Sequence, residues 1–224
     1  MSSLSFTPEF EVLASLDGLA SIEELSNEIS VYAASPFFVR VNCGPLARRF
    51  LDAVPNSYYD KCRGLGMLPN IDIRVHRLNI GEYPAVPGWH CDGLRRETYF
   101  SQPAMDRATI RDTVFGFISS APEVSRTEII TQNLDVAGPS NGGDEFGFWR
   151  EVSSQVPRDV TRTEVQEGQF VSIGAKTLHR ATPAKVRGWR LFFRMSMWHN
   201  AYLGDGGKVA NQQQVYVVSE HSGW

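Results

Sequence analysis

The stretch Ile71-Asp72-Ile73-Arg74-Val75-His76 alternates apolar and polar side chains, and Arg77-Leu78 follows it. Successive side chains of an extended backbone project to opposite faces, so this period of two predicts a strand with one buried face. A helix would instead place its apolar residues three or four positions apart. The stretch therefore marks the start of a β region, and the first third of the chain before it is predicted to be mainly helical.

More short strands are predicted after this one, with turn residues between them. The segment 133–147 contains Gly138, Pro139 and Gly142 among other turn residues and predicts a mobile loop. A series of short strands separated by turns is typical of an all-β sandwich or barrel. The further strands are expected at residues 113–119, 126–131, 161–166, 169–173, 189–198 and 214–218.

Two helices are expected in the N-terminal part. Ser21 followed three residues later by Glu24 has the form of a capping box, and Ile22, Leu25 and Ile29 recur at helical spacing after it. These residues predict one helix of an N-terminal helical layer that covers about residues 1–60.

A second helix is predicted from Gly44-Pro45, because proline is favoured at the first helical position. Leu46, Phe50 and Leu51 would form its buried stripe, and Pro55 marks its end.

The length and composition are those of one globular domain: the chain has 224 residues, of which 42% are apolar and 21% charged, and a net charge of −3. This acidic balance makes nucleic acid an unlikely partner. No run approaches the roughly 20 apolar residues that span a bilayer, so no membrane partner is expected, and the N-terminus lacks the pattern of a secretion signal. Oligomeric state is not predicted. The domain would combine the helical layer, a β core over about 71–198 and a C-terminal extension over 199–224.

Cys43, Cys62 and Cys91 are irregularly spaced and form no disulfide framework or structural zinc pattern. This usage favours a reducing, cytoplasmic location, although a Cys43–Cys62 bridge stays open.

The run Trp89-His90-Cys91-Asp92-Gly93 carries a candidate metal site. His90 and Asp92 are two residues apart, so in an extended backbone an imidazole and a carboxylate project to the same side. His179 supplies a second imidazole. Two histidines and one carboxylate leave positions of a metal open, which is the ligand set of non-haem ferrous oxygenases. The alternative is a surface turn, since Asp92-Gly93 is itself a turn pair.

The predicted strand at 189–198 places arginines on one face. Arg190, Phe192, Arg194 and Ser196 share one parity, and apolar residues alternate with them. Arginines inside a small barrel would be costly unless they met anions, and a dicarboxylic co-substrate would supply a carboxylate for a bidentate pair. The alternative is a surface strand with solvated arginines.

His90-x-Asp92, then His179, then Arg190 eleven residues later resembles the Fe(II)- and 2-oxoglutarate-dependent dioxygenases. Asn79-x-x-x-Tyr83 before the first ligand adds to the resemblance, which covers roughly residues 71–198. The resemblance implies a mainly β fold with N-terminal helices, a double-stranded β-helix or jelly roll with helices packed on one side.

It also implies that His90, Asp92 and His179 bind Fe(II) and form the catalytic centre. Arg190 would bind the distal carboxylate of the co-substrate 2-oxoglutarate. Arg194 would either reach an acidic group of the substrate or, with Ser196, anchor the co-substrate instead. Asn79 and Tyr83 are further candidate co-substrate contacts.

The activity implied is oxidation by O2 with release of succinate and CO2. Halogenating members of the family lack the carboxylate ligand, so Asp92 favours hydroxylation. A small polar molecule is the expected substrate, an anionic one if Arg194 points into the remaining cavity. Two alternatives stay open: the same chemistry on a protein side chain or nucleobase, and a cupin-like module that holds a metal without redox turnover. The loop 94–100 is either a substrate-binding lid or a solvated loop.

Overall fold

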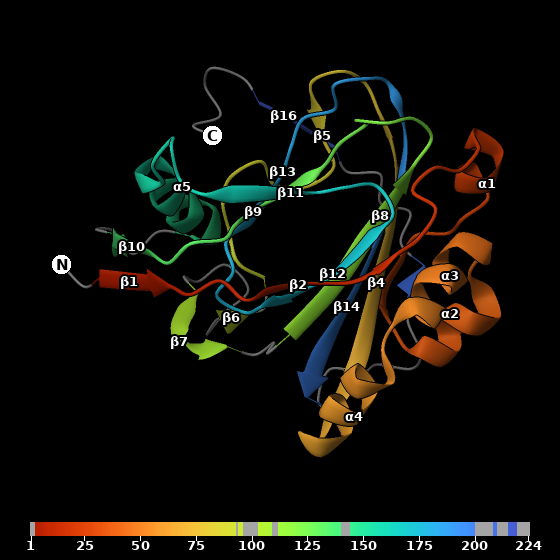
Figure 1. Cartoon of the computed structure of the whole chain (residues 1–224), viewed down its shortest axis with the longest axis horizontal. Helices are drawn as coiled ribbons and strands as arrows, with labels where there is room; N and C mark the ends of the chain where they lie inside the picture. Colours follow the sequence, from red (N-terminus) through yellow and green to blue (C-terminus); the bar gives the residue numbers. More distant parts are fainter. Residues whose placement is uncertain are drawn as a thin grey trace.

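The computed structural model describes residues 3–92, 94–95, 103–108, 112–139, 144–199, 208–209 and 215–218. Over these residues the chain is mainly β, with antiparallel sheets and few helices (Figure 1). The largest sheet has seven strands in the order β15 (Lys208–Val209), β3 (Val31–Ala34), β4 (Met67–Leu78), β14 (Gly188–His199), β8 (Asp112–Ser119), β12 (Gln169–Gly174) and β2 (Phe10–Ser15).

A second sheet has three strands, β11 (Arg162–Val165), β9 (Thr127–Ile130) and β13 (His179–Ala181). The remaining strands form pairs: β1 (Ser3–Phe6) with β10 (Leu134–Ala137), β16 (Tyr216–Val217) with β5 (Glu82–Tyr83), and β6 (Leu94–Arg95) with β7 (Ala104–Ala108). The helices are α1 (Ile22–Ser26), α2 (Pro36–Asn42), α3 (Pro45–Ala53), α4 (Asn56–Gly64) and α5 (Glu145–Gln155).

The antiparallel pair β4–β14 lies in the middle of the large sheet. Its register aligns Arg190 with His76 and continues without a break to the opposite end of both strands. The predicted alternation at 71–76 is confirmed, because Ile71, Ile73 and Val75 project to one face, where they join a buried apolar cluster, and the polar residues between them project to the other.

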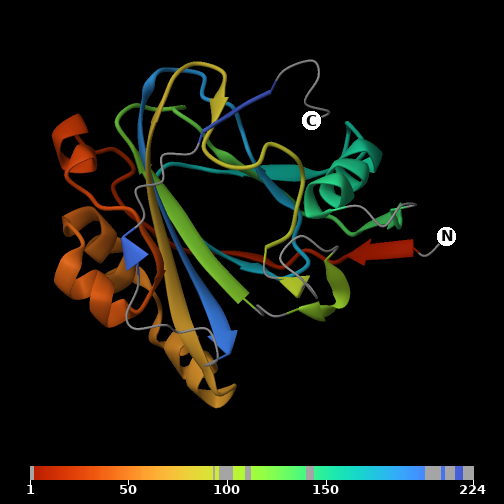
Figure 2. The same ribbon diagram turned by 180° about the vertical axis from the view of Figure 1, so that it is seen from behind.

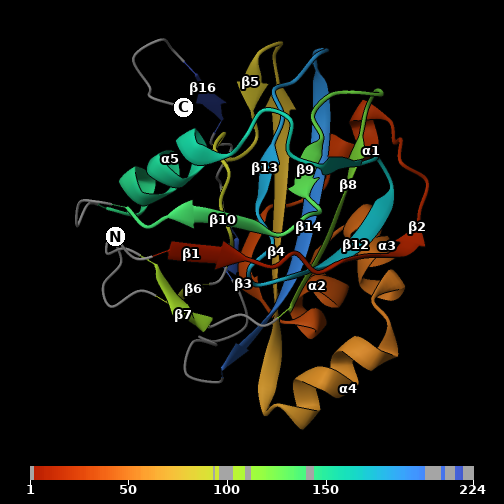
Figure 3. The same cartoon turned by 60° about the vertical axis from the view of Figure 1, so that its left-hand side comes forward.

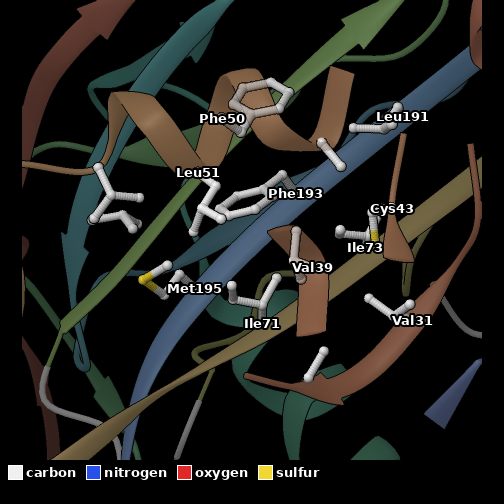
Figure 4. Close-up of a cluster of buried hydrophobic side chains, with 14 of the residues drawn as sticks. Val31, Val39, Cys43, Phe50, Leu51, Ile71, Ile73, Leu191, Phe193 and Met195 are labelled. Carbon is white, nitrogen blue, oxygen red and sulfur yellow. The ribbon is translucent and has the colours of Figure 1, made fainter. Parts of the chain in front are cut away.

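Helices α1–α4 cover the apolar face of this sheet, as Figure 2 shows from behind. Figure 4 shows the cluster that joins them. The Phe50 ring of α3 stacks on Phe193 of β14 at 5.4 Å and lies 5.7 Å from Phe170 of β12. Gly116 of β8 admits this ring, because a Cβ there would lie 2.6 Å from Phe50 Cε1. The predicted stripe of Leu46, Phe50 and Leu51 is confirmed.

The opposite face of the large sheet packs against the three-stranded sheet. Phe115 and Phe117 of β8 and Val171 of β12 form one buried cluster with Ile129 of β9 and Val165 of β11. Arg190 and Arg194 of β14 also lie on this face. Helix α5 lies at the far side of the three-stranded sheet, next to β10 (Figure 3).

Several expectations for the N-terminal part need correction. The capping box of Ser21 and Glu24 is present, but α1 ends at Ser26, so Ile29 lies outside it, and Ile22 is 57% exposed. Residues 1–60 are not a purely helical layer, because β1, β2 and β3 lie within them. Strand β2 forms because its backbone pairs with β12, which is distant in sequence.

The segment 133–147 was predicted as a loop, but it contains β10 and the first turn of α5. Asp144 caps α5 by accepting a hydrogen bond from the Gly147 N–H at 2.7 Å. The strand predicted at 214–218 is present only as Tyr216–Val217. The loop 94–100 lies largely outside the described residues.

All three cysteines are free and buried, so the Cys43–Cys62 bridge is absent. No helix in the described ranges is long and apolar enough to cross a membrane.

Helix α3 begins at Pro45 as predicted, but its cap comes from a distant residue. Gly44 has no side chain, and the buried Glu28 carboxylate accepts from the N–H groups of Leu46 at 2.6 Å, Gly44 at 2.9 Å and Ala47 at 3.3 Å. A Cβ at Gly44 would lie 2.5 Å from Glu28 Oε1, so a larger residue there would displace the capping carboxylate. Burial raises the pKa of Glu28, although the three N–H donors act in the opposite direction.

Glu28→Ala should lower the free energy of unfolding by about 2–3 kcal/mol, because it leaves buried N–H donors of α3 without an acceptor. Urea unfolding at pH 7 measures this loss. Glu24→Ala is the control, since its capping carboxylate is exposed and its removal should cost only about 0.5–1 kcal/mol. Equal losses in the two variants would contradict the assigned role of Glu28.

Candidate metal centre

A backbone bridge brings the two candidate histidines together. His90 and His179 pair antiparallel, and each N–H donates to the carbonyl of the other at 3.0 Å. Residues directly opposite in an antiparallel pair project to the same side. The two imidazole rings therefore lie side by side, with their centroids 4.7 Å apart.

Each imidazole is oriented by a carbonyl two residues earlier in the chain. His90 Nδ1 donates to the Gly88 carbonyl at 2.8 Å, and His179 Nδ1 donates to the Thr177 carbonyl at 3.0 Å. Because a carbonyl oxygen can only accept, Nδ1 carries the proton in both rings. The lone pair of Nε2 is then free for a metal, and the Nδ1 bond fixes the orientation of the ring.

Asp92 completes the group. Its Oδ2 lies 3.5 Å from His179 Nε2, and one ligand atom from each of His90, Asp92 and His179 lies within 4.8 Å of the others. The predicted triad is therefore brought together, from two segments that are distant in the sequence. Cys91 points away from the triad and packs with Trp89 and other apolar residues, as predicted.

The protonation states suit metal binding. Burial, reinforced by the neighbouring His179, lowers the pKa of His90 to about 4, so this imidazole is neutral at pH 7. Burial alone would raise the pKa of Asp92, but the Arg194 guanidinium and the two histidines outweigh it and hold that pKa well below its usual range. Two imidazoles and one carboxylate form a donor set that fits Fe(II).

Arg194 ties the carboxylate ligand to the large sheet. Its Nη1 donates to Asp92 Oδ2 and its Nη2 to Asp72 Oδ2, both at 2.5 Å. Asp72 in turn accepts from the Ala33 N–H at 3.1 Å. Burial acts to lower the pKa of Arg194, but the two carboxylates outweigh it and raise that pKa, so the guanidinium is charged and paired on both sides. This arrangement makes Arg194 a positioning residue for Asp92.

Arg190 has a different environment. Its side chain is 2% exposed, its Nε donates to the Ser125 carbonyl at 3.1 Å, and its Nη2 contacts Thr127 Oγ1 at 3.4 Å. The guanidinium carbon lies 4.2 Å from the centre of the Phe117 ring. Among the described residues, no carboxylate lies within 4.0 Å of it. Burial lowers the pKa of Arg190 to about 9, although the more distant Glu167 carboxylate acts in the opposite direction, so Arg190 remains a cation at pH 7 without a carboxylate at ion-pair distance.

The other predicted contacts lie elsewhere. Ser196 is buried on the same face of β14 and shares a hydrogen bond of 3.3 Å with Thr113. Asn79 is exposed, and its backbone N–H and its side-chain amide both donate to the Glu82 carboxylate. Tyr83 is half-buried and lies in β5. In the described part of the chain, no hydrogen bond joins any of these to the triad. Their role as co-substrate contacts stays a prediction.

Sequence reasoning missed Asp72 and the acceptors of Arg190. Asp72 had a usable signal, because it shares the polar parity of β4 with Arg74 and His76. Ser125 and Thr127 carried none, since β9 approaches Arg190 only through the packing of two sheets.

Comparisons with known proteins add no family assignment. No protein-family model and no curated protein matches the chain. The solved structures that match include three that resemble it weakly. The apo form of ThoJ, a non-heme monooxygenase, aligns over 79% of this chain and 76% of its own at 14% identity, with a TM-score of 0.37. The ThoJ–Ni complex covers the same shares at 11% identity and a TM-score of 0.34. EvdMO1 aligns over 60% of this chain at 14% identity and a TM-score of 0.33, and only 28% of its length is matched. The assignment of the site therefore depends on its own geometry.

His90 should make stability depend on pH. Its pKa in the folded protein is about 4, below the ordinary 6.5, so the unfolded chain takes up a proton that the folded protein does not. The contribution is complete above pH 6.5 and is lost as the pH falls towards 4, by up to about 3 kcal/mol. Urea unfolding of metal-free protein between pH 7 and 4 should show a steeper loss for the wild type than for His90→Gln. Parallel curves would contradict the burial of a neutral imidazole.

Proposed function

We propose that the chain is a single-domain Fe(II)- and 2-oxoglutarate-dependent oxygenase that hydroxylates a small polar molecule. His90, Asp92 and His179 would hold Fe(II) through two imidazole nitrogens and one carboxylate oxygen. The packing of the three-stranded sheet on the polar face of the large sheet supports a jelly roll as the scaffold.

The observation that carries the proposal is the environment of Arg190. A buried cation is costly unless an anion compensates it. Arg190 contacts a carbonyl and a hydroxyl among the described residues, and the Glu167 carboxylate acts on it only from beyond ion-pair distance. Arg190 lies on the same face of β14 as Arg194, which binds the ligand Asp92. A dicarboxylate that reaches from the metal to Arg190 would supply the missing charge by a bidentate pair.

The environments of Arg190 and Arg194 support different roles for these two residues, which the sequence left open. Arg194 is already paired with Asp72 and Asp92, which supports positioning of the metal ligand rather than recognition of an acidic substrate. Arg190 is the better anchor for the distal carboxylate of 2-oxoglutarate.

Fe(II) and 2-oxoglutarate, when bound, would supply the oxidising chemistry, in which O2 is consumed, 2-oxoglutarate becomes succinate and CO2, and the substrate gains a hydroxyl group. The protein's own part is to orient both imidazoles, to keep His90 neutral and Asp92 ionised, and to bury the co-substrate away from water. The presence of Asp92 supports hydroxylation over halogenation.

An uncoupled turnover assay tests this function without knowledge of the substrate. Purified protein with Fe(II), O2 and 2-oxoglutarate should release succinate slowly, and a panel of polar small molecules should identify one that accelerates the release. His179→Ala should lose stoichiometric iron and this activity, because two protein ligands remain. Tight iron binding without 2-oxoglutarate binding would favour the cupin-like module instead.

Arg190→Met removes the charge but keeps most of the volume. Binding of 2-oxoglutarate to the iron-loaded protein should weaken about 10- to 100-fold, since a charge-assisted bidentate pair is lost. The melting temperature of ligand-free protein should stay equal or rise, because a buried cation without a carboxylate is removed. Calorimetry and a thermal melt measure both quantities. Exposed Arg77→Met is the control. Destabilisation with unchanged co-substrate affinity would assign Arg190 a structural role.

A further inference from the structure

A cavity separate from the metal centre is lined by four arginines. It has a volume of about 470 Å³ and lies beside the C-terminal half of α5. Arg150 of α5, Arg158 in the turn after it, Arg162 of β11 and Arg180 of β13 all contribute to the wall. We call it the arginine pocket. Figure 1 labels α5, β11 and β13, which carry Arg150, Arg162 and Arg180.

The pairing of β9 with both neighbouring strands places two of these arginines. Glu128 of β9 lies opposite Arg180 in the register. One of its carboxylate oxygens contacts Arg180 Nε at 2.6 Å and the other contacts Arg162 Nε at 3.2 Å. The Arg180 guanidinium also lies 4.4 Å from the centre of the Trp89 ring. Arg162 and Arg180 are therefore held in place before any ligand arrives.

The charge of the pocket is unbalanced. Glu128 is 7% exposed and both of its oxygens are engaged, so it neutralises at most one of the four guanidinium groups. Arg150 and Arg158 are exposed, and among the described residues neither has a carboxylate within 4.0 Å. No Asp or Glu lines the cavity. This concentration of positive charge occurs in a chain whose net charge is −3.

The pocket lies behind the metal centre rather than within it. Trp89 precedes His90 and Arg180 follows His179, so their side chains project to the opposite face of the same bridge. None of the three candidate metal ligands lines the cavity. Ser153 of α5 closes the wall by donating to the Trp89 carbonyl at 3.1 Å.

We propose that the arginine pocket binds a small phosphate-bearing anion with two or more negative charges. Guanidinium groups pair with phosphate oxygens through two parallel hydrogen bonds, and several arginines around one cavity favour a multiply charged group. The volume falls within the range of about 300–1,000 Å³ that is typical of small-molecule sites, so a diphosphate or a phosphate monoester fits. Arg150 and Arg158 would close on the ligand, while Arg162 and Arg180 form its fixed base.

Calorimetric titration of the metal-free protein with pyrophosphate, in low salt and with a chelator, tests the site. The wild type should bind one pyrophosphate saturably. Arg150→Glu/Arg158→Glu should weaken binding by at least about 100-fold, and the milder Arg158→Gln by about tenfold. Circular dichroism verifies that each variant is folded.

The control is Arg63→Glu/Arg77→Glu, which makes the same change of net charge at exposed positions outside the pocket. It should alter the affinity by no more than about threefold at low salt. Equal weakening in the two double variants, or no saturable binding to the wild type, would overturn the proposal.

Two further titrations separate this site from other anion sites. Arg190→Met should bind pyrophosphate like the wild type, and loss of binding there would place the anion at the proposed co-substrate site and refute the pocket. Citrate should bind more weakly than pyrophosphate, and equal or tighter citrate binding would contradict the preference for phosphate.

Discussion

The pairing of β4 with β14 is the constraint on which the rest of the structure depends. The two strands align over their full length, so every residue of one is assigned a face by the other. One face is apolar and is covered by α1–α4, which buries Phe50 against Phe193 and Phe170. The opposite face carries Arg190 and Arg194. A shift of one residue would exchange the two faces and place charges under the helices.

The face of β14 opposite the helices carries two buried arginines, and the fold accommodates their charges in two ways. Arg194 is compensated by Asp72 and Asp92, and this chain of ion pairs extends to the backbone of β3. In the described structure Arg190 forms no ion pair within 4.0 Å, and it is compensated by a carbonyl, a hydroxyl, the faces of Phe117 and Phe192 and the more distant Glu167 carboxylate. Buried cations of the second kind are expected where a ligand completes the pairing, and this difference separates a positioning residue from a proposed binding residue.

The short backbone bridge between His90 and His179 presents polar or charged side chains on both of its faces. Towards the large sheet it presents two oriented imidazoles and the Asp92 carboxylate. Towards α5 it presents Trp89 and Arg180, which form part of the arginine pocket. Alternation of side chains along an extended backbone is sufficient to separate the two sites. The metal centre and the proposed anion site thus share a few residues of backbone but no side chain.

Local sequence patterns predict the elements that depend only on neighbouring residues. The period of two at 71–76, the alternation along 189–196, the Ser21–Glu24 capping box and the start of α3 at Pro45 all agree with the structure, because each follows from neighbouring side chains. Residue type and spacing also select the three candidate metal ligands.

Features that depend on distant partners are set by tertiary packing. Strand β2 exists because β12 pairs with it, and the cap of α3 comes from Glu28. Helix α5 is preceded by a glycine-rich segment that obscured its start. The pairing of Arg194 with Asp72, the isolation of Arg190 and the gathering of four arginines behind the metal centre arise only when separate strands pack. Side-chain spacing specifies the face on which a residue lies, but not which residue it meets there.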